Sequence, residues 1–235
     1  MTSTAREPDA EPISRTYRFA MAVCGPLIRW WGRLEVSGEE HMPRSGPTLL
    51  IGNHDSHWDP VAIGVAARRR RQIRALAKSS LWKIRPLAPI LHGMGQIPIE
   101  RGKGDVAALS TAIDRLREGA CIGVFPEGTI SRGQRLRPRS GAGRLALEVP
   151  EARIVSVAVT GTVDIVRFPK RPRIRVEFFA PSAGERVEGE DASTLASRIT
   201  GEIRERAPIA IPGRKRKAAR YREAAAAAAA EAELP

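Results

Sequence analysis

The chain has 235 residues, of which 42% are hydrophobic, and its formal net charge at pH 7 is +13. This hydrophobic content is enough to build one packed core, so a chain that is disordered throughout is excluded. The two cysteines, Cys24 and Cys121, are far apart and show no CxxC spacing, which argues against a disulfide framework and favours a reducing compartment.

The excess of Lys and Arg indicates an anionic partner, and nucleic acid and phospholipid head groups are the two usual candidates. Composition alone does not choose between them, although an aromatic content of 5% argues against a surface that stacks single-stranded bases. A genome rich in G and C, which encodes Arg and Ala freely, also explains part of this charge.

The first 33 residues divide into two parts. Residues 1–14 are polar and contain two prolines, and we expect a disordered lead-in there. Residues 15–33 mix aromatic and apolar side chains with four arginines and predict an amphipathic helix. Such a helix either contacts a membrane interface, as Trp30 and Trp31 suggest, or covers the core of the domain itself.

No segment reaches the ~20 apolar residues that a membrane-spanning helix needs. The longest candidate, residues 19–28, is broken by Gly25 and Pro26 and lacks the cleavage pattern of a signal peptide. We therefore expect a cytoplasmic protein that is at most peripheral, on the cytoplasmic face of a membrane.

Residues 34–210 alternate predicted strands with predicted helices. This alternation is typical of an α/β domain with a layered, mainly parallel sheet flanked by helices, in which ligands bind beyond the carboxyl ends of the strands. The last strand alternates apolar and polar residues, as an exposed edge strand does. We expect strands at residues 34–36, 48–51, 73–77, 96–99, 121–125, 154–159 and 174–179, and helices at 60–68, 83–94, 106–118, 142–148 and 191–206.

Residues 211–235 form a basic and alanine-rich tail. Alanine favours helix, but such a helix would have no apolar face to bury. We expect a solvated tail, whose basic cluster at 214–217 contacts anionic lipid. The alternative is that this cluster serves as a nucleic-acid or localisation tag.

Residues 53–60 carry the first candidate site. His54 is placed to leave a buried strand, and Asp59 to cap the helix that begins with Pro60. The carboxylate can then hold one imidazole nitrogen while the other takes a proton, as in the His–Asp half of a catalytic triad. Two alternatives are a metal site made by His54, Asp55, His57 and Asp59, and a capping turn with incidental histidines.

Two further motifs follow predicted strands. The segment 95–101 ends in Arg101 before a glycine-rich turn, and a guanidinium there suits a phosphate group, although a lone surface arginine is the simpler interpretation. The turn 125–129 contains Pro126 and Gly128, which direct Glu127 and nearby amides toward the same crevice. Glu127 could bind hydroxyl groups of a substrate or pair with Arg101.

Together, N-H-x(4)-D, G-x-I-x-I-x-R and F-P-E-G-T stand in this order between residues 53 and 129. They resemble the glycerophospholipid acyltransferase family, the lysophosphatidic acid acyltransferases in particular. The fourth block of that family would be residues 154–159, with Ser156 where proline is usual. Arg139 stands where lysine is common, and the arginine that usually follows the third motif is displaced to Arg132.

The resemblance implies transfer of a fatty acyl group from acyl-CoA or acyl carrier protein to the free hydroxyl of a lysophospholipid, with 1-acylglycerol-3-phosphate as the default acceptor. His54 would be the catalytic base and Asp59 would orient it. Arg101 would bind the phosphate and Glu127 the glycerol. The backbone amides around Gly128 and the side chain of Lys78 would be the candidates to stabilise the oxyanion. Gly95 and Thr129 complete the expected substrate-binding set.

The resemblance requires neither metal nor cofactor, and it implies direct transfer without an acyl-enzyme. The expected partners are the acyl donor, the lysolipid and an anionic membrane surface, with no nucleic acid. The arginines of 68–71 and of the loop 132–139 would concentrate these anionic partners. A basic nucleic-acid-binding protein with a degenerate acyltransferase-like core and a metal-dependent hydrolase remain as alternatives.

Overall fold

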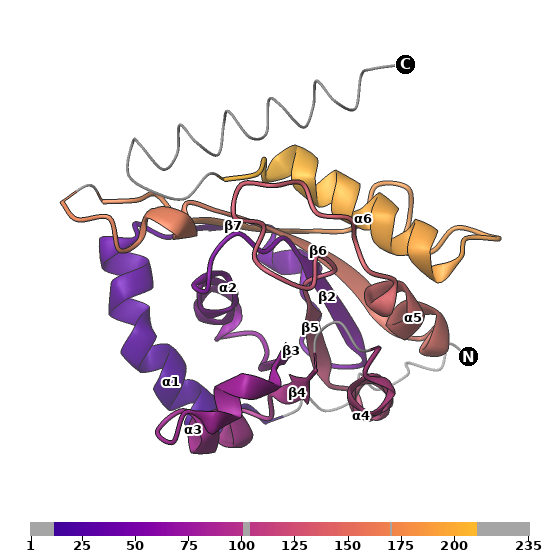
Figure 1. The fold of residues 1–235 in the computed structure, drawn as a ribbon, viewed down its shortest axis with the longest axis horizontal. Helices are drawn as coiled ribbons and strands as arrows, with labels where there is room; N and C mark the ends of the chain where they lie inside the picture. Colours follow the sequence, from indigo (N-terminus) through magenta and orange to yellow (C-terminus); the bar gives the residue numbers. More distant parts are fainter. Residues whose placement is uncertain (1–11, 101–103, 170, 211–235) are drawn as a thin grey trace, which may run out of the picture.

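Seven strands form a single sheet in the order β1-β7-β6-β2-β5-β3-β4, with helices on both faces (Figure 1). The structure, a computed structural model, describes residues 12–100, 104–169 and 171–210. Among the described strands, β6 and β7 form the one antiparallel pair, so the mainly parallel layered sheet that the sequence predicts is confirmed. The strands are β1 (Glu35–Ser37), β2 (Thr48–Gly52), β3 (Ile73–Lys78), β4 (Ile97–Ile99), β5 (Cys121–Val124), β6 (Arg153–Thr160) and β7 (Arg175–Phe179).

The strand β7 corrects one expectation. It is not an edge strand, because β1 pairs with it on the side away from β6. Its residues alternate because successive side chains of a strand point to opposite faces of the sheet. Arg175 is exposed on one face, and the next residue, Val176, is fully buried on the other. The edge positions belong to β1 and β4.

The central strands β5, β2 and β6 are parallel and in register. Thr48 of β2 is level with both Cys121 of β5 and Arg153 of β6, so these three strands end at the same edge of the sheet. All five residues of β2 are buried, which explains why the sequence there is a continuous apolar run. The loops that follow β2 and β5 therefore leave the sheet next to each other, and they carry the first and third motifs.

One face of the sheet is covered by α1 (Arg15–Pro26), α2 (Asp59–Ala67) and α3 (Ala88–Gly93). Ser14 caps α1 by accepting a hydrogen bond from the backbone N–H of Tyr17 at 3.1 Å. After α1 the chain widens into a π-helical segment, η1 (Leu27–Trp31), directly beyond Pro26, which has no N–H to continue the α-helical ladder. Tyr17 and Met21 of α1 pack into the core on this face.

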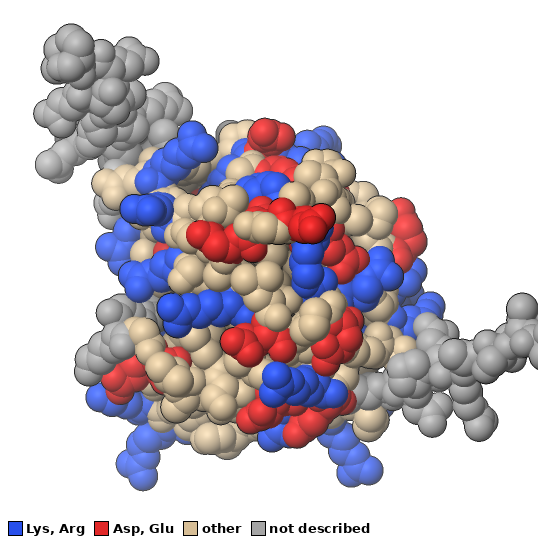
Figure 2. Space-filling view, turned by 90° about the vertical axis from the view of Figure 1, so that its right-hand side faces the viewer, with Lys and Arg blue, Asp and Glu red and all other residues tan. Residues whose placement is uncertain are grey.

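The other face is covered by α4 (Val106–Arg117), α5 (Gly141–Glu148) and α6 (Ala192–Arg206), which pack on a second hydrophobic cluster (Figure 1). Short 3-10 helices occur at η2 (Glu39–His41), η3 (Ser79–Lys83) and η4 (Thr162–Asp164). Figure 2 looks onto the side of α4, α5 and α6 and shows acidic and basic side chains interspersed. The strong positive charge of the chain is therefore not concentrated on this side. Within the described ranges, no helix combines the length and apolar character needed to cross a bilayer.

The arginines of 68–71 lie between the end of α2 and the start of β3, at the amino ends of the strands. Arg71 is 2% exposed and donates to the carbonyls of Gly46 (2.6 Å) and Gly119 (2.5 Å). It therefore ties loops together on the edge of the sheet opposite to the first and third motifs. The block therefore lies at the other end of the strands from His54, and its expected role in concentrating anionic partners stays a prediction.

Candidate active site

His54 and Asp59 are held together at the carboxyl end of β2. The Nδ1 atom of His54 lies 3.1 Å from Oδ2 of Asp59, and the two residues are 5% and 0% exposed. The predicted pairing of these two side chains is therefore present in the structure.

Asp59 differs from the expectation in one respect, because it is the first residue of α2 and Trp58 takes the N-cap position. Its carboxylate turns back to the preceding loop and accepts the backbone N–H groups of Asp55 (2.6 Å) and Ser56 (2.7 Å) on Oδ2. The other oxygen, Oδ1, accepts the hydroxyl of Thr162. The carboxylate thus organises the loop that carries His54 as well as the imidazole.

These contacts fix the protonation pattern of the imidazole. The Asp59 carboxylate is an acceptor, so Nδ1 of His54 carries the hydrogen and Nε2 has a free lone pair. The ring also stacks on Phe125, with 4.4 Å between ring centroids and 17° between planes. The arrangement leaves one nitrogen as a base and prevents rotation of the ring, which is what general-base chemistry requires.

The alternative metal site is not assembled. Asp55 points away from His54 and pairs with Arg204, at 2.8 Å between Oδ2 and Nη1, while His57 is exposed. Across the part of the chain that the structure describes, no group of three or more His, Cys, Asp or Glu residues is arranged to hold a metal ion. Of the four side chains, His54 and Asp59 form a pair, while Asp55 binds Arg204 and His57 is exposed.

Glu127 lies beneath the His54 loop. It is 4% exposed, its Oε2 accepts the backbone N–H of His54 at 3.0 Å, and its Oε1 accepts Nε–H of Arg204 at 2.6 Å. Burial raises the pKa of the Glu127 carboxyl above its ordinary value, and the charge of Arg204 opposes that rise. Both oxygens therefore bind protein groups, and the observed counter-ion is Arg204, where the sequence suggested a substrate hydroxyl or Arg101.

Arg204 is a residue of the site that reasoning from the sequence missed. The residue stands in the last turn of α6, 77 positions from Glu127 and 149 from Asp55. The available signal was its helical spacing, because it continues the row of Ala196 and Thr200, which are both buried. A charged residue on the buried row of an amphipathic helix indicates a buried partner.

Gly128 adopts a left-handed conformation with φ 69°, and a Cβ there would lie 2.7 Å from Nε of Arg139. Its own N–H donates to the carbonyl of Phe125 at 2.9 Å. The amide of Gly128 itself is therefore engaged within the turn, and a role of the neighbouring amides in stabilising an oxyanion stays a prediction. Thr129, one residue later, is exposed and lines neither of the two cavities described below.

The remaining predicted residues are spread along the sheet. Lys78 is exposed at the carboxyl end of β3, on the same edge as His54. Gly95 precedes β4 with φ 63°, a conformation that favours glycine, and a Cβ there would meet the Arg74 side chain; its expected part in substrate binding stays a prediction. Arg101 lies outside the described residues.

Two cavities, each of about 400 Å³, meet the site from opposite faces of the sheet. The first, here called the α1 cavity, lies between α1, α2, α3 and the sheet and reaches His54, His57 and Lys78 at one end. The second, the α4–α5 cavity, is bordered by Glu100, Gly104, Gly128, Arg139 and Arg144. Leu76, Val124 and Phe125 line both cavities, so the ring stacked on His54 also separates them.

Comparison with known proteins agrees with this geometry. The sequence model of the family described as Acyltransferase matches residues 33–160, which is more than half of the chain and includes His54, Asp59 and Glu127. The chain belongs to the acyltransferase family. The resemblance inferred from the three motifs is therefore confirmed, and the protein is an O-acyltransferase with the family's fold.

Three relatives illustrate the similarity of this acyltransferase to known proteins. A 1-acyl-sn-glycerol-3-phosphate acyltransferase of Bacillus subtilis is 24% identical over 204 residues, which cover 86% of this chain and 90% of the relative. A lyso-ornithine lipid O-acyltransferase of Pseudomonas aeruginosa is 32% identical over 182 residues, covering 71% of this chain and 66% of the relative. The crystal structure of the 1-acyl-sn-glycerophosphate acyltransferase PlsC of Thermotoga maritima has a TM-score of 0.58 at 20% identity and covers 80% of this chain and 81% of that one.

Proposed function

We propose that this acyltransferase transfers a fatty acyl group from acyl-CoA or acyl carrier protein to the free hydroxyl of 1-acylglycerol-3-phosphate, giving phosphatidic acid. The observation that carries the proposal is the His54–Asp59 pair at the end of an apolar cavity. The Bacillus subtilis 1-acyl-sn-glycerol-3-phosphate acyltransferase, which aligns over most of both chains, supports this acceptor.

In the proposed reaction, Nε2 of His54 removes the proton of the acceptor hydroxyl as that oxygen attacks the thioester carbonyl. Asp59 holds Nδ1–H and stabilises the imidazolium that forms. The carbonyl oxygen becomes an oxyanion, and the ammonium group of Lys78, on the wall of the same cavity, is the proposed donor to it. When the intermediate collapses, the thiolate leaves and takes the proton from His54, so transfer is direct.

The α1 cavity suits the acyl chain of the donor. Its walls are mainly apolar side chains of α1, α3 and the sheet, and a chain lying there would place its carbonyl next to His54. Filling the cavity with methylene groups removes apolar surface from water, at about 0.8 kcal/mol per CH₂. This gives the enzyme binding energy that does not depend on the head group of the acceptor.

The α4–α5 cavity suits the phosphate of the acceptor. Glu100 and Gly104, the described neighbours of the predicted phosphate-binding Arg101, line it, and Arg139 and Arg144 supply two further guanidinium groups. The lyso-ornithine lipid O-acyltransferase of Pseudomonas aeruginosa makes lyso-ornithine lipid the second candidate acceptor. The two candidates differ in the presence of a phosphate.

Residues 15–33, which form α1 and η1, have both a buried and an exposed side. Tyr17, Met21 and Ile28 are buried in the core, while Phe19 is 67% and Trp30 is 82% exposed. We propose that the exposed row inserts into the cytoplasmic face of an anionic membrane, where the arginines of the same segment meet head groups.

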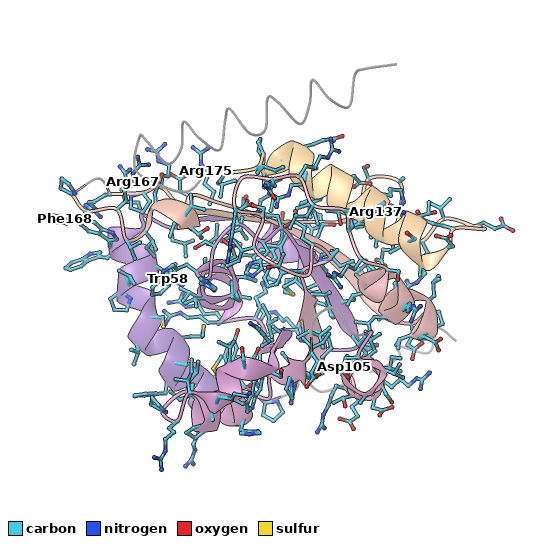
Figure 3. All side chains as sticks on the ribbon, viewed as in Figure 1. Trp58, Asp105, Arg137, Arg167, Phe168 and Arg175 are labelled. Carbon is cyan, nitrogen blue, oxygen red and sulfur yellow. The ribbon has the colours of Figure 1, made fainter. Side chains whose placement is uncertain are left out.

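A second segment extends the exposed side of α1 and η1. Phe168 is 82% exposed and lies with Arg167 at one end of the molecule, pointing outward (Figure 3). Its loop is fastened to η1, because Trp31 donates Nε1–H to the carbonyl of Ile165 at 2.7 Å and stacks on Phe168. We therefore include this loop in the proposed membrane surface.

The proposed function is tested by offering labelled acyl-CoA and acyl carrier protein with a panel of lysolipids that includes 1-acylglycerol-3-phosphate and lyso-ornithine lipid. Replacing His54 with Ala is expected to lower kcat by about 10²–10⁴-fold, the usual contribution of a general base. His41→Ala, an exposed histidine of η2 at the amino edge of the sheet, is the matched control. Undiminished transfer by the His54 variant would refute the mechanism, and preference for the lyso-ornithine lipid would refute the acceptor.

A further inference from the structure

Arg204 is a buried arginine that the proposed reaction does not use directly. Its side chain is 10% exposed, and it binds the Asp55 carboxylate with two nitrogens, Nη1 to Oδ2 at 2.8 Å and Nη2 to Oδ1 at 3.1 Å. Its Nε donates to Glu127 at 2.6 Å. One guanidinium of the last helix thus joins the loop after β2 to the loop after β5.

The two carboxylates that Arg204 holds fix the backbone of His54 and its surroundings. Glu127 accepts the backbone N–H of His54 at 3.0 Å, and the carbonyl of His54 accepts the N–H of Ser131 at 2.8 Å. The hydroxyl of Ser131 in turn donates to Asp55. The peptide groups on both sides of the His54 Cα are therefore bound to this network, and Arg204 is its cation.

We propose that Arg204 is a positioning residue for catalysis, through which the C-terminal helix α6 sets the orientation of the His54 loop. This inference rests on the proposed role of His54 as the base.

The charges near His54 explain why a cation is needed there. The carboxylates of Asp55, Asp59 and Glu127 are each at most 4% exposed. All three belong to the loop that carries His54 or accept a hydrogen bond from it. Asp59 is satisfied by backbone amides, a hydroxyl and the imidazole, but Asp55 and Glu127 share Arg204. Without it, two buried carboxylates would repel each other across the loops that they are meant to hold.

An arginine suits this position better than a lysine. The planar fork of the guanidinium binds both oxygens of Asp55 while its Nε reaches Glu127, and a single ammonium group cannot match these three directions. Lysine would preserve the charge and lose the geometry, so the two contributions can be separated by substitution.

The test compares Arg204→Gln and Arg204→Lys with Arg198→Gln. Arg198 is a matched control because it also lies on α6, is 19% exposed and binds the carboxylate of Glu190 at 2.8 Å, without contact to the site. We expect Arg204→Gln to lose about 10²-fold in kcat with little change in KM, since small misplacement of a catalytic group has effects of this size. Arg204→Lys should lose less, and Arg198→Gln should keep the wild-type kcat.

A pH profile adds a readout that a purely structural role would not move. Glu127 faces Arg204 of α6, and His54 and Asp55 of the loop after β2. Its pKa is already raised by burial, so removing the opposing cation raises it further, and the carboxyl becomes protonated at higher pH. A protonated Glu127 accepts the His54 N–H less well. We expect the acid limb of kcat in Arg204→Gln to move to higher pH, and that of Arg198→Gln to stay in place.

Nuclear magnetic resonance of the imidazole nitrogens tests the inference without any acceptor. The chain has four histidines, so the His54 signals can be assigned by comparison with His54→Ala. We expect these signals to shift in the Arg204 variants and to remain unchanged in Arg198→Gln.

A folded Arg204→Gln with wild-type kcat and unshifted His54 signals would overturn the proposal, as would an equal loss in Arg198→Gln. If Arg204→Gln does not fold, the same criteria apply to Arg204→Lys. If the wild type transfers to no acceptor in the panel, the proposed function fails, and the His54 signals still decide the role of Arg204.

Discussion

At the residue scale, the hydroxyl of Ser156 is a buried polar group. Ser156 lies in the middle of β6 and is 0% exposed, and among the residues that the structure describes its Oγ has no hydrogen-bond partner. It stands in the fourth family block at the place where proline is usual. A buried hydroxyl without a partner costs the folded state the loss of its hydration, about 1–3 kcal/mol.

Ser156→Ala is therefore expected to raise the free energy of unfolding by about 1 kcal/mol, the lower end of that cost, because some packing is also lost. Chemical denaturation gives the measurement. The control is Thr48→Val on the neighbouring strand β2, because the hydroxyl of Thr48 is bound to Arg71 at 3.1 Å and its removal should lower stability. A fall in the stability of Ser156→Ala would show that the hydroxyl has a partner in solution.

At the element scale, α1 forms both the wall of a cavity and an exposed face. Tyr17 and Met21 anchor it in the core, Cys24 lines the α1 cavity, and Ala22 points outward. Under the proposed function, α1 would therefore limit the length of the acyl group that fits beside His54.

Cys24→Trp is expected to fill part of the α1 cavity and to move the preference of the enzyme toward shorter acyl donors, because an indole takes up volume that distal methylene groups need. The measurement is kcat/KM over a series of donors of increasing chain length. Ala22→Trp, on the exposed side of the same helix, should leave the preference unchanged. Equal shifts in both variants would mean that the acyl chain does not lie in this cavity.

At the scale of the whole molecule, the charge is distributed unevenly. Arg15, Arg18, Arg29 and Arg33 lie in or directly after α1 and η1, and residues 12–33 contain no acidic residue. The side of α4, α5 and α6 shows both signs interspersed (Figure 2). We propose that an anionic bilayer attracts the side of the molecule formed by α1 and η1, which also exposes Trp30 and lies beside the exposed Phe168.

Sedimentation with vesicles containing anionic phospholipid is expected to show binding that weakens as salt is added, because exposed charges are screened over about 10 Å at 0.1 M ionic strength. Trp30→Glu should weaken binding at least about fivefold, since one charge near such a surface is worth about 1 kcal/mol. Val106→Glu is the control, because Val106 is 74% exposed on α4, on the other side of the molecule. Vesicle binding that does not depend on salt concentration, or an equal loss of binding in both variants, would contradict the proposed orientation.

The sequence by itself determined the order of strands and helices, the mainly parallel sheet and the pairing of His54 with Asp59. These features depend on local properties of the sequence. Apolar runs of strand length and helical spacing indicate the elements, and the short loop between the strand that precedes His54 and the helix that begins near Asp59 brings these two residues close together. The three motifs in order were sufficient to indicate the family.

Only the tertiary structure decided what surrounds that pair. Glu127 pairs with Arg204, and the Asp59 carboxylate binds backbone N–H groups of its own loop. Arg71 is buried at the opposite edge of the sheet, and a cavity lies on each face. Arg204 meets Asp55 across 149 positions of the chain. Such contacts depend on how α6 packs over the sheet, and local spacing carries no information about a partner brought near by the folding of the whole domain.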